Sequence, residues 1–333
     1  MYKEVLNAKN FGKEELLERP NVVGVAVGKK VTDGETTDDL SVVVLVEKKL
    51  TPNALTELDL VPQSVLGVPT DVVEVGKLEA LVDRKARHRP APGGVSIGHF
   101  AITAGTLGAV VLDAITGERV ILSNNHVLAN SNDAMIGDTI IQPGYYDGGR
   151  TSTDTIGYLL RFKEIDFGEE PADCPIAEGS AKVLNSVAKF VGSKHRLSAA
   201  RIQAGAVNYV DAALAQPIND GAISNEILDI GVIDGTVSPY IGMFIRKSGR
   251  TTGYTHGSVL MLHGTVNVSY GGDRMARFEE QIIAGAMSAG GDSGSLGVAE
   301  EENKAFGLLY AGSSQATIFN PIDKVIEALT IKF

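Results

Sequence analysis

Short β-branched runs separated by turn residues dominate the hydrophobic pattern of the first eighty residues. The runs over 21–27 and 40–47 are rich in Val and bounded by Gly and Asp, which is typical of strands. The predicted elements are a helix over 3–18, strands over 21–27, 40–47 and 70–76, and a short helical stretch beginning at Thr51-Pro52, where Thr caps and Pro suits the first turn. Together they predict a small α+β domain over residues 1–82.

A basic, proline-bearing segment poor in apolar residues follows at 83–94. Such a composition is typical of a solvated connector between domains. We interpret it as a linker, in preference to a processing site.

From residue 95 the pattern becomes a series of short strands, which we expect to form barrels. The predicted strands cover 107–112, 119–123, 138–142 and 155–162, and the turn Asp113–Gly117 between the first two indicates a hairpin. Residues 176–192 break this pattern with apolar residues at helical spacing, which predicts an amphipathic helix inserted near 169–200. A last helix is predicted over 321–329. The fold class is therefore mainly β, and the domain spans 95–333.

Composition and net charge limit the classes of molecule that we expect the protein to bind. Hydrophobic residues make up 44% of the 333 residues, so a sizeable core is expected, and the net charge is −11. An acidic surface repels nucleic acid and anionic lipid, so we expect neither nucleic acid nor membrane as a partner. Cys174 is the single cysteine and we expect it to be inert. No apolar signal core or membrane-length run is present in the sequence, so we expect a cytoplasmic protein.

The strongest chemical signal is the run Gly290-Gly291-Asp292-Ser293-Gly294-Ser295. A serine hydroxyl is a weak nucleophile that needs a base to accept its proton and donors to hold the developing oxyanion. Glycines beside Ser293 let two backbone N–H groups point to one place, and we assign these to Gly291 and Ser293. A Gly-rich hairpin turn explains this run equally well when it is taken alone.

His126 is the candidate base, because it follows the apolar strand that ends in Ser123-Asn124-Asn125. A strand end can hold an imidazole in a fixed orientation, and His is the side chain that titrates near neutral pH. The remaining histidines are left as ordinary surface residues: His88, His99, His195, His256 and His263.

Asp211 is the candidate acid, because Asn208-Tyr209-Val210 precede it and small apolar residues follow it. A buried carboxylate is costly unless paired, and an imidazole N–H is a partner that would use it. The alternatives Asp154, Asp166 and Asp173 stand in polar, turn-like contexts.

The order His126, Asp211, Ser293, with the serine in Gly-Asp-Ser-Gly, resembles the trypsin/chymotrypsin family over roughly 95–333. The resemblance implies a double β-barrel with the site in the cleft between the barrels, followed by a C-terminal helix. Ser123–Val127 and Gly290–Ser295 are most similar to a cytoplasmic bacterial branch related to plant Narrow Leaf proteins. The chain lacks an Ile-Val-Gly-Gly start near 95, so what pairs with Asp292 is an open question.

By family position, Met287 is expected at the base of the primary substrate pocket, and Tyr310, Ala311 and Gly312 in the strand that pairs with the substrate backbone. No acid stands at 287, so a small or medium apolar side chain is expected rather than Lys or Arg.

These features predict a serine endopeptidase that acts on peptides or proteins through an acyl-enzyme and needs no metal or cofactor. The alternative is a peptide-binding or assembly protein on a peptidase fold. The N-terminal module would regulate, recruit substrate or assemble protomers, and a homo-oligomer is left open.

Overall fold

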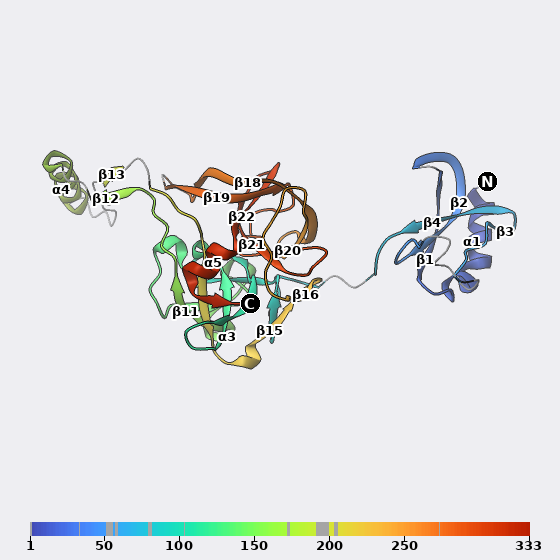
Figure 1. The fold of residues 1–333 in the computed structure, drawn as a ribbon, viewed down its shortest axis with the longest axis horizontal. Helices are drawn as coiled ribbons and strands as arrows, with labels where there is room; N and C mark the ends of the chain where they lie inside the picture. Colours follow the sequence, from blue (N-terminus) through green and yellow to red (C-terminus); the bar gives the residue numbers. More distant parts are fainter. Residues whose placement is uncertain are drawn as a thin grey trace. The chain divides into compact units, whose positions relative to one another are not determined.

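The computed structural model describes residues 2–32, 34–50, 56, 59–78, 82–102, 104–171, 174–190, 200–202, 206–272 and 274–333. The chain divides into two compact units, Met1–Val82 and Asp83–Phe333 (Figure 1). Within the described residues, no helix combines the length and the apolar character needed to cross a bilayer.

The first unit is one sheet with a helix on one face. Its elements are α1 Tyr2–Leu17, β1 Val22–Thr32, β2 Glu35–Val46, β3 Ser64–Val65 and β4 Val68–Glu74. The strand order is β1-β2-β4-β3. Alternate β2 residues Val42, Val44 and Val46 are buried against Val5 and Leu16 of α1, as the period-two pattern requires. The helix expected at Thr51-Pro52 falls outside the described residues.

The first half of the second unit is a curled eight-stranded sheet, ordered β23-β8-β9-β14-β11-β10-β6-β7. Its elements, with short neighbours, are β5 Ala91–Gly93, β6 Ser96–His99, β7 Gly105–Thr106, β8 Ala109–Asp113, β9 Arg119–Ser123, α2 Asn125–Leu128, β10 Thr139–Ile141, α3 Thr151–Asp154, β11 Thr155–Phe162, β14 Ala213–Pro217, β15 Ile223–Ile227, β16 Gly231–Val232 and β23 Ile331–Lys332. A core that includes Ile97, Leu107 and Ile121 fills it.

The second half is a closed six-stranded barrel, β17-β18-β19-β22-β21-β20. Its strands are β17 Phe244–Gly249, β18 Gly253–Ser269, β19 Met275–Gly285, β20 Leu296–Ala299, β21 Ala305–Gly312 and β22 Ala316–Pro321, and α5 Ile322–Leu329 follows them. Ile322 and Val325 of α5 share one core with Leu122 of β9 and Val298 of β20, so the helix joins both halves. The expected mainly β, double-barrel fold class with a C-terminal helix is confirmed.

An arm leaves the first half between β11 and β14. It consists of β12 Glu169–Pro171 paired with β13 Ala200–Ile202, and of α4 Pro175–Phe190 (Figure 1). The expected helical insertion is therefore present. Ile176, Val183 and Leu184 of α4 are exposed.

Residues 83–94 are not a solvated connector but pack against the second unit. The Arg84 guanidinium donates to Ser248 Oγ at 2.7 Å and pairs with Asp229, while Ala91 is fully buried. β5 runs parallel to β15. The basic composition that indicated a linker instead serves contacts within this unit.

Candidate active site

His126 and Asp211 meet because of the register between β9 and β14. These antiparallel strands place Ser123 opposite Ala213, so the residues just after β9 and just before β14 lie at the same sheet end. His126 Nδ1 lies 2.5 Å from Asp211 Oδ2, and the His126 backbone N–H donates to Asp211 Oδ1 at 3.2 Å. The carboxylate thus holds both the ring and the backbone of the histidine.

Asp211 is fully buried and its backbone is fixed on both sides. Its N–H donates to Asn320 Oδ1 at 2.9 Å, and its carbonyl accepts from Asn124 Nδ2 at 2.7 Å. The Tyr270 hydroxyl donates to Oδ2 at 2.8 Å. A buried carboxylate is tolerated only with such donors, and these contacts supply them to Asp211 next to His126.

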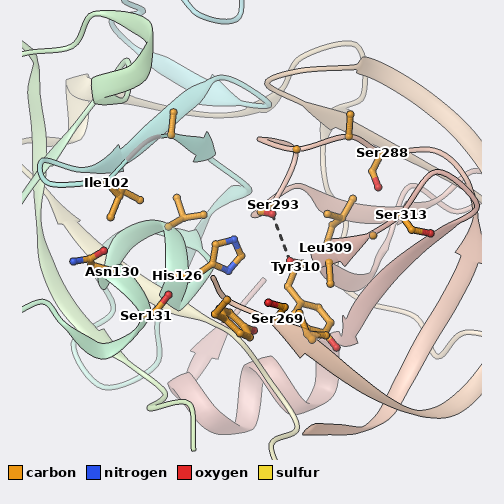
Figure 2. Close-up of a pocket in the computed structure, with 18 of the residues that line it drawn as sticks. Ile102, His126, Asn130, Ser131, Ser269, Ser288, Ser293, Leu309, Tyr310 and Ser313 are labelled. Atoms are coloured by element: carbon orange, nitrogen blue, oxygen red, sulfur yellow. Dashed lines mark hydrogen bonds between the residues drawn. The ribbon is translucent and has the colours of Figure 1, made fainter. Parts of the chain in front are cut away.

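Ser293 lies in the loop between β19 and β20 and lines the same cleft as His126 (Figure 2). Gly294 must be glycine, because its φ is +97° and a Cβ would come within 2.2 Å of Ser123 Oγ. Ser293 Oγ donates to the Tyr310 carbonyl at 3.5 Å (Figure 2). In the part of the chain that the structure describes, no hydrogen bond joins this hydroxyl to His126.

The carbonyls of the Ser293 loop are tied down by neighbouring threonines and backbone. Thr106 Oγ1 donates to the Gly291 carbonyl and Thr251 Oγ1 to the Gly290 carbonyl, each at 2.8 Å. The Thr106 N–H donates to the Ser293 carbonyl at 2.8 Å. Among the described residues, the N–H groups of Gly291 and Ser293 have no acceptor, so both remain available to a ligand.

The structure shows what pairs with Asp292. Lys247 Nζ lies 3.3 Å from Asp292 Oδ2, and both side chains are fully buried. Asp292 also accepts from the N–H groups of Thr251, Thr252 and Ala289 at 2.8, 3.1 and 2.9 Å. Burial alone would raise the pKa of Asp292, but the Lys247 charge and these hydrogen bonds outweigh it and lower the pKa. The loop is therefore built around an internal ion pair.

A second buried ion pair, between Arg250 after β17 and Asp147 in the first half of the unit, supports the same loop. Arg250 Nε and Nη2 donate to the two Asp147 oxygens at 2.5 and 2.6 Å, and the Arg250 N–H donates to Thr106 Oγ1 at 3.0 Å. Burial would raise the pKa of Asp147, but Arg250 and a bond from Ser96 lower it. Thr106 in turn holds the Gly291 carbonyl.

A cleft of about 820 Å³ contains the predicted residues His126, Ser293, Tyr310, Ala311 and Gly312. Met287 does not line it and is therefore not the pocket base we expected.

The Met287 side chain is 5% exposed and belongs to the barrel core with Met243 and Val259. The next residue, Ser288, lines the cleft instead, and its Oγ lies 2.8 Å from Thr317 Oγ1. A spacing counted from Ser293 cannot tell which of two adjacent side chains faces the cleft.

The alternative acids are engaged elsewhere or lie outside the described residues. Asp154 accepts from the Arg150 N–H at 2.9 Å, and Asp166 accepts from the Gly168 N–H at 2.8 Å. Asp173 and His195 are outside the described part of the chain. His99 pairs with Asp138 at 3.1 Å.

Sequence reasoning missed several residues that build the site. They are Lys247, Tyr270, Asn320, Thr106 and the Arg250–Asp147 pair. Of these residues, only Lys247 could have been noticed in the sequence, because it is a charged residue inside the strand-like run that forms β17.

No family model and no curated protein matches the chain. Among solved structures, it is similar to the Nocardiopsis protease NAPase, with 13% identity over 72% of this chain and 97% of the protease, at a TM-score of 0.46. It is also similar to Thermobifida fusca protease A (14%, 72% and 96%, TM-score 0.45) and Cellulomonas bogoriensis chymotrypsin (15%, 73% and 97%, TM-score 0.44). At these identities and TM-scores, function has to be judged from this chain's own residues.

Proposed function

We propose that the chain is a serine endopeptidase with Ser293 as nucleophile, His126 as general base and Asp211 as the orienting carboxylate. The observation that carries this proposal is the 2.5 Å contact between His126 Nδ1 and the fully buried Asp211, at the wall of the cleft that Ser293 also lines. A buried acid on one ring nitrogen sets the tautomer and leaves the other nitrogen to accept a proton.

In the proposed reaction the Ser293 hydroxyl turns from the Tyr310 carbonyl to His126 Nε2. Ser293 Oγ attacks the scissile carbonyl while Nε2 accepts its proton, and the imidazolium forms against Asp211. The N–H groups of Gly291 and Ser293 hold the oxyanion. Collapse transfers the proton to the leaving amine and leaves an acyl-enzyme, which water then hydrolyses by the same route.

The substrate backbone would add to the free edge of β21. This strand pairs with β20 only as far as Leu308, whereas its pairing with β22 continues to Gly312. Tyr310, Ala311 and Gly312 therefore present an edge to the cleft that no described strand covers. An extended peptide can pair there through its main chain.

The side chain before the scissile bond would enter between Ser288–Gly290 and Ala311–Ser313. Ser288 lines this space, and the described residues that line the cleft include no Asp, Glu, Lys or Arg. We therefore propose a small, uncharged side chain there.

A peptide library separates this proposal from a binding protein without activity. We expect the wild-type protein to cleave peptides and Ser293→Ala to be inactive, because the loop amides alone form no acyl bond. His263→Ala, in an exposed part of β18, is the control that should cleave like wild type. If the folded wild-type protein binds peptides but cleaves none, the alternative of a peptide-binding protein is favoured. The absence of a Ser293–His126 hydrogen bond among the described residues is the observation that supports this alternative.

We also propose a place in the branch related to Narrow Leaf proteins, and cytoplasmic residence. The strings Ser123–Val127 and Gly290–Ser295 support the first, and the single Cys174, which forms no intrachain disulfide, agrees with the second. The N-terminal unit is proposed to regulate, recruit substrate or assemble protomers.

A further inference from the structure

Tyr270 shares a single carboxylate oxygen with the histidine. Its hydroxyl donates to Asp211 Oδ2 at 2.8 Å, and His126 Nδ1 contacts the same oxygen at 2.5 Å. The Tyr270 ring also stands edge-on to the His126 ring, with centroids 5.8 Å apart. The phenol therefore touches both members of this pair.

Tyr270 reaches this position from the other half of the unit, because it forms the tip of the β18–β19 hairpin. The tip is tied to the loop after the histidine: Arg274 Nη1 donates to the Ser131 carbonyl at 3.2 Å and to Asp133 Oδ2 at 3.1 Å. Phe167 packs beneath both, 5.5 Å from the Tyr270 ring centroid and 5.3 Å from the Arg274 guanidinium. The tip is thus held against the first half by polar and aromatic contacts.

The Tyr270 phenol is a permanent donor. Burial and the neighbouring Asp211 charge raise its pKa well above the ordinary value of 10.0, so it keeps its proton wherever a peptidase would work. Tyr310 does not replace it. The Tyr310 hydroxyl is buried and has no hydrogen-bond partner among the described residues.

We propose that Tyr270 is a positioning residue that fixes the Asp211 carboxylate and weakens the electrostatic attraction between this carboxylate and the His126 ring. This inference rests on the proposed peptidase function. Two donors on Oδ2 divide its charge, so the phenol limits how strongly the carboxylate favours the protonated imidazole. The end of β18 that leads into this tip lines the cleft through Val268 and Ser269, and Ser269 lies on the cleft wall near His126 (Figure 2). The hairpin therefore belongs to both the substrate wall and the catalytic apparatus.

The test is Tyr270→Phe, which removes the hydroxyl and keeps the ring. We expect kcat to fall about 10- to 100-fold, the size expected for losing one hydrogen bond to a charged group, with KM unchanged. The acidic limb of the pH–rate profile should move to higher pH, because Asp211 then acts on the imidazole alone. Tyr158→Phe removes an exposed hydroxyl on β11 and is the control that should match wild type.

A second readout does not depend on hydrolysis. The His126 Nδ1 proton in a 2.5 Å contact should give a far-downfield NMR resonance, and Tyr270→Phe should move it further downfield. Arg274→Met keeps the phenol but removes the contacts that hold the hairpin tip. It should also lower kcat, by a smaller factor than Tyr270→Phe does. If Tyr270→Phe fails to fold, Arg274→Met decides by the same two readouts.

An unchanged pH profile and an unmoved resonance in folded Tyr270→Phe would overturn the proposal, even if kcat fell, since that pattern describes a structural residue. A wild-type protein that hydrolyses nothing would refute the peptidase function. The resonance would still decide whether Tyr270 acts on the His126–Asp211 pair.

Discussion

Lys247→Met should destabilise the second unit and displace the Ser293 loop together. The ammonium lies 3.3 Å from Asp292 with both side chains fully buried. At an effective dielectric constant of about 20, Coulomb attraction over this distance is about 5 kcal/mol. Removing one partner of a buried pair costs about 3–5 kcal/mol. Because Asp292 keeps the donors Thr251, Thr252 and Ala289, we expect the lower end, about 3 kcal/mol.

Thermal unfolding and probe labelling measure the two effects separately. A loss of about 3 kcal/mol should lower Tm by about 6–12 °C in a unit of this size. Displacement of the Gly291 and Ser293 amides should slow fluorophosphonate labelling about 100-fold. The double variant Lys247→Met, Asp292→Asn should regain most of the stability, because no charge is left buried. Lys304→Met, an exposed lysine paired with Glu302, is the control and should change little. A Lys247→Met protein with the wild-type Tm and labelling rate would refute this reasoning.

Three further predictions concern the acid, low pH and the segment that follows the first unit. Asp211→Asn should stay folded but lower kcat about 10⁴-fold by favouring the wrong imidazole tautomer, and a loss under tenfold would rule Asp211 out as the orienting acid. The pKa values of Asp292 and Asp147 are lowered from 3.8, so the unfolded state binds more protons than the folded state at low pH. The stability that these two carboxylates contribute is present above pH 4 and should be lost as the pH falls below it. A Tm that stays constant from pH 5 to pH 3 would contradict this prediction. Residues 84–94 should resist limited proteolysis because they are bonded into the second unit, and early cleavage within them, mapped by mass spectrometry, would restore the linker interpretation.

The residues proposed to be catalytic could be picked out from the sequence because each carries a local signal. Ser293 has its glycines, His126 follows a strand and Asp211 precedes one. The β9–β14 register then brings the last two together. That register was not predicted from the sequence and comes from the structure.

The supporting residues could not be predicted, because their roles depend on contacts between distant segments. Tyr270 reaches Asp211 only through the long β18–β19 hairpin, and Asn320 reaches it from β22. Met287 was misplaced because spacing along the chain does not determine which side a side chain faces. The linker interpretation of residues 83–94 was wrong because a basic composition is typical of a solvated segment, whereas Arg84 and Arg89 form hydrogen bonds within the second unit.

The most direct test of the peptidase proposal is to map the adduct of a fluorophosphonate on the native protein. Peptide mass spectrometry should find one adduct, on Ser293, and the labelling rate should rise with pH as the base becomes neutral. His126→Ala should slow labelling by orders of magnitude, and Ser293→Ala should abolish it. A folded wild-type protein that stays unlabelled between pH 6 and pH 9, or one labelled at a residue other than Ser293, would contradict the account.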